Sequence, residues 1–260
     1  MRFNHLVVLI FSAVIIPLLI VSCSESVDSF EETTFYLSEE IGFGEDGSIQ
    51  AYSEFNESDE LIEFGIFLSR HIFEEELPGE HQEITIRFPR AEEAPPYNHF
   101  GINWAPHGHL PLEVYGEPHF DFHVYFISQI ERGTITGENQ EAMYLEPAPV
   151  YVAPDYELLE DSGVPQMGAH WVDKTSPEFN DGEFTHTYIY GYYNAQMIFI
   201  EPMITLDFLR SVDERVDIPI KLPEAFQRSG YYPSRYYIER DMLTDEVRII
   251  FTDIEFHEAS

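Results

Sequence analysis

Apolar and polar positions alternate along most of the chain, whereas the three-to-four-residue spacing of an amphipathic helix is scarce. A period of two places successive side chains on opposite faces of a strand, so each alternating run predicts a half-buried β-strand. The predicted strands cover residues 48–55, 61–68, 83–88, 119–127, 185–193, 196–201, 235–240 and 246–256. Helical spacing is found in residues 205–212 and, over shorter stretches, in 69–77 and 223–228.

Two breaks between predicted strands have the length of hairpin turns, namely Asn194-Ala195 and Leu243-Thr244-Asp245. Short loops of this kind join neighbouring antiparallel strands. Proline and glycine interrupt the other connections, and the sequence contains no internal repeat. We therefore expect a mostly β fold, an antiparallel β-sandwich or barrel with long loops and one or two short helices.

The first segment of the chain is apolar from residue 6 to residue 21 and follows the positive charge of Arg2. This length is short for a membrane span, which needs roughly 20 residues, but it suits the core of a signal peptide. The segment ends in Leu19-Ile20-Val21-Ser22-Cys23, which resembles a bacterial lipobox. The resemblance implies cleavage before Cys23, attachment of lipid such as palmitate to Cys23, and a place in the cell envelope. An ordinary signal peptide with an incidental cysteine is the alternative.

Four segments follow from this pattern. We expect a lipoprotein signal peptide in residues 1–22 and a flexible acidic tether in 23–32. A β-rich domain that carries the functional site is expected in residues 33–210. A β-rich C-terminal extension is expected in residues 211–260. The lipid on Cys23 would anchor the protein to a bacterial membrane, on the periplasmic or surface side of the outer membrane.

The chain has 48 acidic and 13 basic residues, a net charge of −35. Nucleic acid is excluded as a partner because its recognition needs a basic surface. Anionic lipid headgroups are repelled as well, so membrane contact is expected through the lipid alone. The sequence lacks a P-loop and the Gly-x-Ser-x-Gly motif of serine hydrolases, and its single cysteine is assigned to lipid. The small-molecule or protein partner is left unidentified.

Histidines concentrate in one part of the sequence, where His107, His109, His119 and His123 fall within 17 positions. Alternation in residues 119–127 places His119, Asp121 and His123 on one face of a strand. The Cα atoms of His119 and His123 would lie about 13 Å apart, whereas each histidine holds a metal only about 6–7 Å from its Cα atom. A straight strand therefore chelates through His119 with Asp121, or through Asp121 with His123.

Other residues are candidates for the same site. His170 lies beside one of two tryptophans, and Glu201 ends an apolar strand, where an unpaired charge would be costly. We expect one divalent transition metal (zinc, iron, copper or manganese), because imidazole and carboxylate ligands suit each of them. The candidate ligands are His107, His109, His119, Asp121, His123, His170 and Glu201. If the site is catalytic, Glu201 or Glu113 is the candidate base, but the sequence leaves enzyme activity open.

Two family resemblances add to this picture. His107-Gly-His109-Leu-Pro-Leu-Glu113, preceded by Gly101, is similar to the first cupin motif, although a second cupin motif does not follow. A closer resemblance is to a family of uncharacterised secreted bacterial proteins with a domain of unknown function. Its blocks correspond to Gly108-His109-x-Pro111, Pro118-His119-Phe120-Asp121-x-His123-x-Tyr125, Met167-Gly168-x-His170-Trp171 and Glu201-Pro202-Met203-Ile204-Thr205. This resemblance covers residues 100–210 and implies a shared β-rich fold and one clustered site, but no activity.

A different class of function is also open. In this alternative the protein is a non-catalytic module that binds a ligand or partner, and its histidines form a structural hydrogen-bond network. Tyrosine-rich stretches at residues 188–193 and 231–237 would then contact a glycan or a protein. Acidic loops at residues 44–47 and 180–183 are further candidates for calcium, although neither has the EF-hand spacing.

Overall fold

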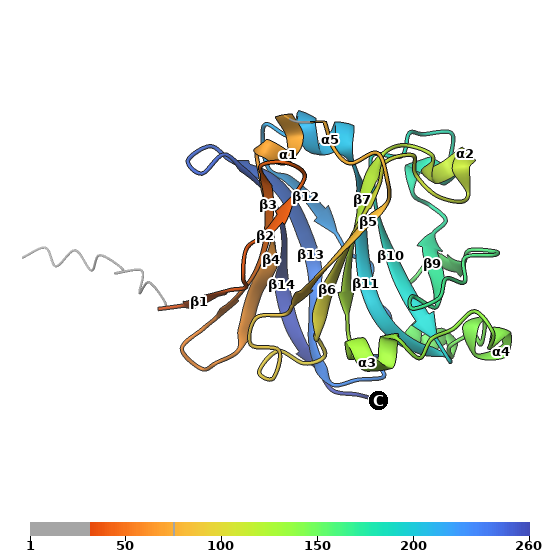
Figure 1. Cartoon of the computed structure of the whole chain (residues 1–260). Coiled ribbons are helices and arrows are strands. Elements are labelled where there is room, and N and C mark those ends of the chain that lie inside the picture. The colour runs from red at the N-terminus through yellow and green to blue at the C-terminus, as the bar shows by residue number, and fades with distance from the viewer. Residues whose placement is uncertain (1–31, 75) are drawn as a thin grey trace, which may run out of the picture. The chain divides into compact units, whose positions relative to one another are not determined.

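Hydrogen bonding between strands in the computed structural model produces two separate antiparallel sheets, seen side by side in Figure 1. The structure describes residues 32–74 and 76–260. The two sheets pack face to face. This confirms the predicted mostly β fold and, of the two predicted architectures, the sandwich rather than the barrel. The predicted signal peptide and Cys23 lie outside the described residues. Within the described part of the chain, no helix is long and apolar enough to cross a membrane.

The first sheet has the strand order β1-β3-β4-β14-β13-β12, and β2 pairs with β3. Its strands are β1 (Thr34–Leu37), β2 (Ile41–Phe43), β3 (Gly47–Phe55), β4 (Leu61–Ser69), β12 (Val216–Pro219), β13 (Gly230–Asp241) and β14 (Glu246–His257). Because β14 pairs with β4, the last strands of the chain and the first ones form one sheet.

The second sheet has the order β5-β6-β7-β11-β10-β9-β8 and carries the candidate site. Its strands are β5 (Gln82–Arg87), β6 (His99–Ala105), β7 (His119–Tyr125), β8 (Tyr156–Leu158), β9 (Ala169–Asp173), β10 (His186–Tyr193) and β11 (Gln196–Thr205). Strands β6, β8 and β9 of this sheet were not predicted. Strand β6 is buried on both faces.

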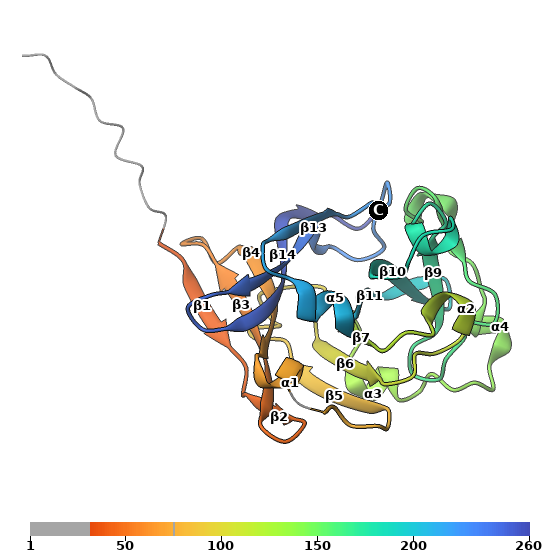
Figure 2. The ribbon, with the colours of Figure 1, turned by 90° about the horizontal axis from the view of Figure 1, so that it is seen from above.

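The helices are short and lie outside the two sheets (Figures 1 and 2). They are α1 (His71–Glu74), α2 (Leu112–Tyr115), α3 (Gln129–Arg132), α4 (Gln140–Met143) and α5 (Leu206–Ser211), with short 3₁₀ turns at Pro149–Tyr151 and Pro177–Phe179. Helix α5 confirms the helix predicted in 205–212, and Thr205 caps it by accepting the Phe208 N–H. The helix predicted in 223–228 is wrong. Buried Phe226 instead pairs in extended form with Ala259.

The two predicted turns are present. Asn194 and Ala195 join β10 to β11, and both have positive φ angles of 51° and 59°. This left-handed conformation matches the twist of a two-residue hairpin. The second turn, around Thr244, joins β13 to β14.

The main hydrophobic core lies between the sheets. Phe120, Phe122 and Val124 point from β7 into this core and are fully buried. We call this side of β7 its inward face. Tyr188 and Tyr190 of β10 belong to the same core, so much of the tyrosine-rich stretch is packed inside the protein.

The opposite side of β7, its outward face, is also covered. Helices α2 and α4 lie on the side of the second sheet that faces away from the first sheet in Figure 1. Two smaller apolar clusters fill this side, one around Tyr125 and Phe199 and one around Tyr115 and Met203. The outward face of β7 is therefore buried as completely as the inward face, and polar side chains on it must find partners inside the protein.

Candidate metal centre

Strand β7 places His119, Asp121 and His123 together on its outward face, as the alternation predicted. Each of the three is at most 4% exposed. The strand lies between β6 and β11 in the second sheet, so neighbouring strands hold it on both edges. This position fixes the direction of the three polar side chains.

The polar side chains divide into two groups. His109, His119 and Asp121 form the first, which we call the Asp121 centre, and His123, His170 and Glu201 form the second, the Glu201 centre. Within each group the nearest ligand atoms all lie within 4.8 Å of one another. The grouping agrees with the prediction that a straight strand cannot hold one ion between His119 and His123. His119 shares a centre with Asp121, and His123 belongs to the other centre.

The loop between β6 and β7 brings His109 to the Asp121 centre. Gly108 has a positive φ of 63°, and a Cβ atom there would lie 2.1 Å from the carbonyl oxygen of Tyr115. The His109 backbone N–H donates to that same oxygen at 3.1 Å. The loop is thus folded back on itself, and the His109 ring packs 4.7 Å from the His119 ring.

Three strands assemble the Glu201 centre. The β7–β11 pairing matches Ile200 with Val124 and Met203 with Asp121, a register that places Glu201 opposite His123. His170 of β9 pairs with Gly191 of β10. Gly191 has no side chain, and a Cβ atom there would collide with the Phe199 ring at 2.1 Å. The Phe199 ring thus occupies the space that a side chain at residue 191 would fill. Beside this ring, Nε2 of His170 lies 3.8 Å from Oε2 of Glu201 on β11.

All four histidines are oriented in the same way by the backbone. Each places Nδ1 against a carbonyl oxygen: His119 on Glu117 at 2.7 Å, His170 on Ser162 at 2.8 Å, His109 on Leu110 at 3.0 Å and His123 on Gly101 at 3.3 Å. A carbonyl oxygen only accepts, so Nδ1 must carry the hydrogen. In a neutral imidazole this leaves Nε2 as a bare lone pair, the form in which histidine binds metals.

The free Nε2 atoms point at carboxylates. The distances are 3.0 Å from His119 and 3.7 Å from His109 to Asp121 Oδ1, 3.3 Å from His123 to Glu201 Oε1, and 3.8 Å from His170 to Glu201 Oε2. Two ligand atoms on a tetrahedral ion with bonds of 2.0–2.1 Å lie about 3.3 Å apart. The spacing of these groups therefore suits a metal ion between them.

These close approaches are not hydrogen bonds. The His119 and His123 Nε2 atoms, Asp121 Oδ1 and Glu201 Oε2 are buried, and none has a hydrogen-bond partner of acceptable geometry among the described residues. A buried polar atom without a partner costs about 1–3 kcal/mol. Two such atoms lie in each centre, and each centre could hold an ion or ligand between them.

Protonation alone does not satisfy the Glu201 centre. Burial lowers the pKa of His123 to about 3 and that of His170 to about 4, so both rings are neutral near pH 7. Burial also raises the pKa of Glu201, and the nearby charge of Asp121 adds to this rise. A protonated Glu201 could donate its one hydrogen to only one of the two imidazoles. The other lone pair would still face an oxygen.

In the Asp121 centre the pKa of the carboxyl group is shifted in the opposite direction, downward. Burial disfavours the charged form of Asp121, but the neighbouring His119 and His109 outweigh it and hold the pKa of Asp121 well below its usual range. Burial likewise lowers the pKa of His109, but Asp121 outweighs this effect and raises it. Asp121 is thus a carboxylate, which is the form that binds a cation.

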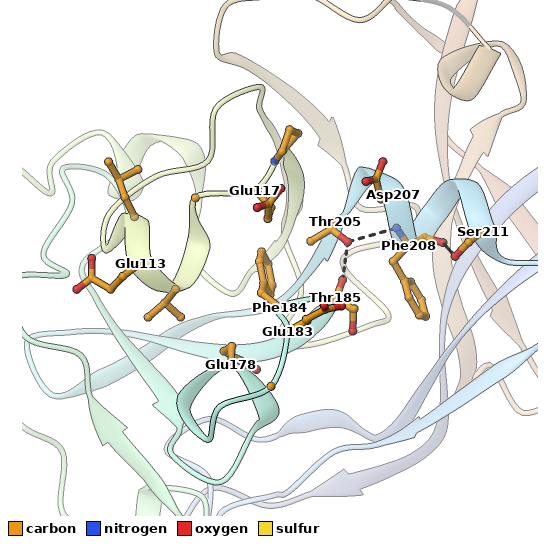
Figure 3. A pocket seen from close by; sticks show the side chains of 15 residues that line it. Glu113, Glu117, Glu178, Glu183, Phe184, Thr185, Thr205, Asp207, Phe208 and Ser211 are labelled. Atoms are coloured by element: carbon orange, nitrogen blue, oxygen red, sulfur yellow. Dashed lines mark hydrogen bonds between the residues drawn. The ribbon is translucent and has the colours of Figure 1, made fainter.

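Two of the predicted site residues lie elsewhere. His107 is exposed on the loop before His109 and belongs to neither group. Glu113 is exposed on α2, where it lines a cavity of about 650 Å³ (Figure 3). Sequence reasoning missed Asn103, which pairs with Asp121 across β6 and β7 and has a buried side-chain oxygen that no described residue satisfies. The alternation of Phe100, Ile102 and Trp104 in β6 could have indicated it.

The cavity lies next to the Asp121 centre but does not contain its ligands. Phe184 separates the two: its ring lines the cavity and packs edge-on against His119 at 5.3 Å. Five carboxylates line the cavity, and none of the described residues around it is basic: Glu113, Glu117, Glu178, Glu183 and Asp207.

Comparison of the chain with protein-family models, curated proteins and solved structures gives no match. The resemblance to a family of uncharacterised secreted proteins therefore stays a prediction.

Proposed function

We propose that this protein is a lipid-anchored, metal-binding protein of the bacterial cell envelope. Its metal is a divalent transition ion (zinc, iron, copper or manganese) held on the outward face of β7. One observation carries the metal proposal: four histidines donate Nδ1–H to backbone carbonyls and turn Nε2 toward buried carboxylates without forming hydrogen bonds to them. Outer-shell carbonyls of this kind orient histidine ligands in metalloproteins.

The alternative, in which the histidines are a structural network, fits this arrangement less well. A hydrogen-bond network needs a donor opposite each acceptor, whereas in the Glu201 centre a protonated Glu201 could donate to only one of the two imidazole lone pairs. The tyrosines that would contact a glycan or a protein in this alternative are also largely buried. Tyr188, Tyr190 and Tyr192 are buried between the sheets, and the hydroxyls of Tyr190 and Tyr192 donate to backbone carbonyls.

In this proposal the candidate base is Glu113 rather than Glu201. Glu201 is assigned to the metal, so of the two predicted bases only Glu113 is free to accept a proton. Glu113 lies on α2 at the cavity beside the Asp121 centre. Any chemistry would therefore take place on the cavity side of that centre.

The metal proposal is tested by elemental analysis of the purified protein after growth with and without a mixed metal supplement. We expect bound transition metal in the wild type and its loss in the double variant His119→Ala/His123→Ala, with circular dichroism showing a retained β fold. His107→Ala is the matched control, because His107 lies two residues from His109 and outside both groups. Absence of metal under both growth conditions would overturn the proposal.

The anchor is supported by the apolar stretch in residues 6–21 and by Ser22-Cys23 directly after it. The test is incorporation of radiolabelled palmitate by cells that express the protein. We expect label in the wild type and none in Cys23→Ser, which should also move from the membrane to the soluble fraction. Equal labelling of the two proteins would contradict a lipid on Cys23.

A further inference from the structure

We infer that the outward face of β7 holds two metal ions with different roles. The ion of the Glu201 centre is enclosed by protein ligands and stabilises the fold. The ion of the Asp121 centre keeps a coordination position open for water or another small neutral ligand. This inference rests on the proposed function, since it assigns roles to ions that the proposal introduces.

A single ion cannot serve both groups. His119 and His123 are four residues apart on one strand, so their Cα atoms lie about 13 Å apart. Each imidazole can hold an ion only about 6–7 Å from its own Cα atom, and the two would have to approach from opposite sides. The third ligands also diverge, because His109 comes from the β6–β7 loop and His170 comes from β9. Two ion positions follow.

The Glu201 centre has enough protein atoms to be closed. Its two histidines approach different oxygens of the carboxylate, His123 facing Oε1 and His170 facing Oε2. With both oxygens bound, the ion has four protein ligand atoms, the same number as in structural zinc sites. The side chains are 1%, 13% and 2% exposed for His123, His170 and Glu201. The Phe199 ring packs on both histidines at 4.7 and 5.5 Å, which keeps water out.

The Asp121 centre has one ligand atom fewer. His119 and His109 both approach the same oxygen, Oδ1 of Asp121, so the group supplies two nitrogens and one oxygen. Three protein ligands and an open position are the pattern of sites that bind an exchangeable water. The His109 side chain is 40% exposed, which gives solvent a path to the ion. The difference between the centres thus depends on whether one or two carboxylate oxygens face the histidines.

Polar atoms around the Asp121 centre fit a bound water. Asn103 lies directly opposite Asp121 in the β6–β7 pairing, and its side-chain oxygen is buried. The Tyr115 ring packs 5.7 Å from the His109 ring, and its hydroxyl is buried too. Neither atom has a hydrogen-bond partner in residues 32–74 and 76–260. A water on the ion would satisfy such groups, and the ion would lower the pKa of that water.

The surroundings determine which ligands can replace the water. Glu117 and Glu183 line the neighbouring cavity close to Phe184 (Figure 3), and the side chains described around it include no cation. Carboxylates repel phosphate esters and other polyanions. The rings of Tyr115 and Phe184 pack on His109 and His119 and make the approach narrow and apolar. The class of ligand is therefore a small neutral Lewis base.

The experiment is a titration of the metal-free protein with Co²⁺, followed by visible absorption and by elemental analysis. Imidazole near pH 8 is the neutral probe ligand, and inorganic phosphate is the anionic comparison. The variants are His109→Ala for the Asp121 centre and His170→Ala for the Glu201 centre, with His107→Ala as the matched control. Glu201→Gln is a second variant of the Glu201 centre, because it preserves the shape of the side chain if His170→Ala does not fold.

We expect two equivalents of Co²⁺ in the wild type and in His107→Ala, and one equivalent in each centre variant. Imidazole should change the spectrum of the wild type and of the Glu201-centre variants but not that of His109→Ala, and phosphate should change none of them. One equivalent in the wild type, lost in both kinds of variant, would overturn the two-ion inference and leave the proposed function intact. An imidazole response that persists in His109→Ala would overturn the assignment of roles. No Co²⁺ binding at all would overturn the proposed function itself.

Discussion

Phe122 and His123 are neighbours in β7 and are equally buried, but they depend on different interactions. Phe122 points inward and is stabilised by apolar contacts with the opposite sheet. His123 points outward, and its Nε2 atom finds no hydrogen-bond partner in the described part of the chain. The inward face of β7 carries only apolar side chains, whereas the outward face carries buried polar atoms without a partner among the described residues. This contrast separates substitutions that damage the fold from substitutions that damage only the metal site.

The largest effect is expected on the inward face. Phe122→Ala removes a fully buried ring from the core between the sheets and should lower the free energy of unfolding by about 3–5 kcal/mol. Chemical denaturation measures this loss, and it should be the same with and without metal. A loss seen only in the metal-loaded protein would mean that the inward face depends on the centres.

A smaller effect, confined to the metal-loaded protein, is expected for Glu201→Gln. Burial holds the pKa of Glu201 well above its usual value, so in the metal-free protein an uncharged amide replaces a carboxyl that is already largely neutral. The metal-free variant should therefore unfold within about 1 kcal/mol of the wild type.

With metal at 100 times the dissociation constant of each centre, each bound ion adds about 2.7 kcal/mol. The variant keeps only the ion of the Asp121 centre and should therefore gain about 2.7 kcal/mol less than the wild type. Thermal denaturation with and without added metal measures the difference. Equal stabilisation of the two proteins would show that Glu201 is not a ligand.

The third effect depends on pH and concerns an outward-face residue that belongs to neither centre. Burial, helped by the charge of Arg132, lowers the pKa of His99 from 6.5 to about 4. Between pH 6.5 and pH 4, His99 therefore binds a proton in the unfolded state but not in the folded state. The stability contributed by neutral His99 is complete above pH 6.5 and is lost as the pH falls toward 4.

His99→Gln should remove this acid sensitivity. Since one pKa unit is worth about 1.4 kcal/mol, the variant should lose roughly 2 kcal/mol less than the wild type between pH 7 and pH 5. The measurement is urea unfolding of the metal-free protein at several pH values, which keeps the metal out of the comparison. Parallel curves for the two proteins would contradict a buried neutral His99.

The smallest effect is expected for His107→Ala. His107 is exposed, whereas His109, two residues later in the same loop, belongs to the Asp121 centre. The substitution should change the free energy of unfolding by less than about 0.5 kcal/mol and leave the metal content unchanged. Elemental analysis and denaturation of the purified variant check both statements. Loss of metal would restore His107 as a ligand.

Local pattern was enough to predict β7 and much of its neighbour β11, but not its other neighbour, β6. The alternation of residues 119–125 placed three polar side chains on one face, and the limited reach of a histidine separated His119 from His123. The Asn194-Ala195 hairpin was also readable, because a two-residue loop between strands has few conformations. His170 and Glu201 were identified as candidates from their neighbours in sequence, but nothing in the sequence joined them to His123 rather than to His119.

The sequence by itself thus determined the class of fold, the two faces of β7 and the kinds of side chain in the site. These features depend on a period of two, which is a local property of the backbone. Only the tertiary structure decided how the candidates divide into an Asp121 centre and a Glu201 centre. That division depends on the register of β7 with β11, which places Glu201 opposite His123, and on the pairing of β9 with β10, which places His170 near the same centre. Pairing between distant strands is set by packing of the whole sheet, and neighbours in sequence carry no record of it.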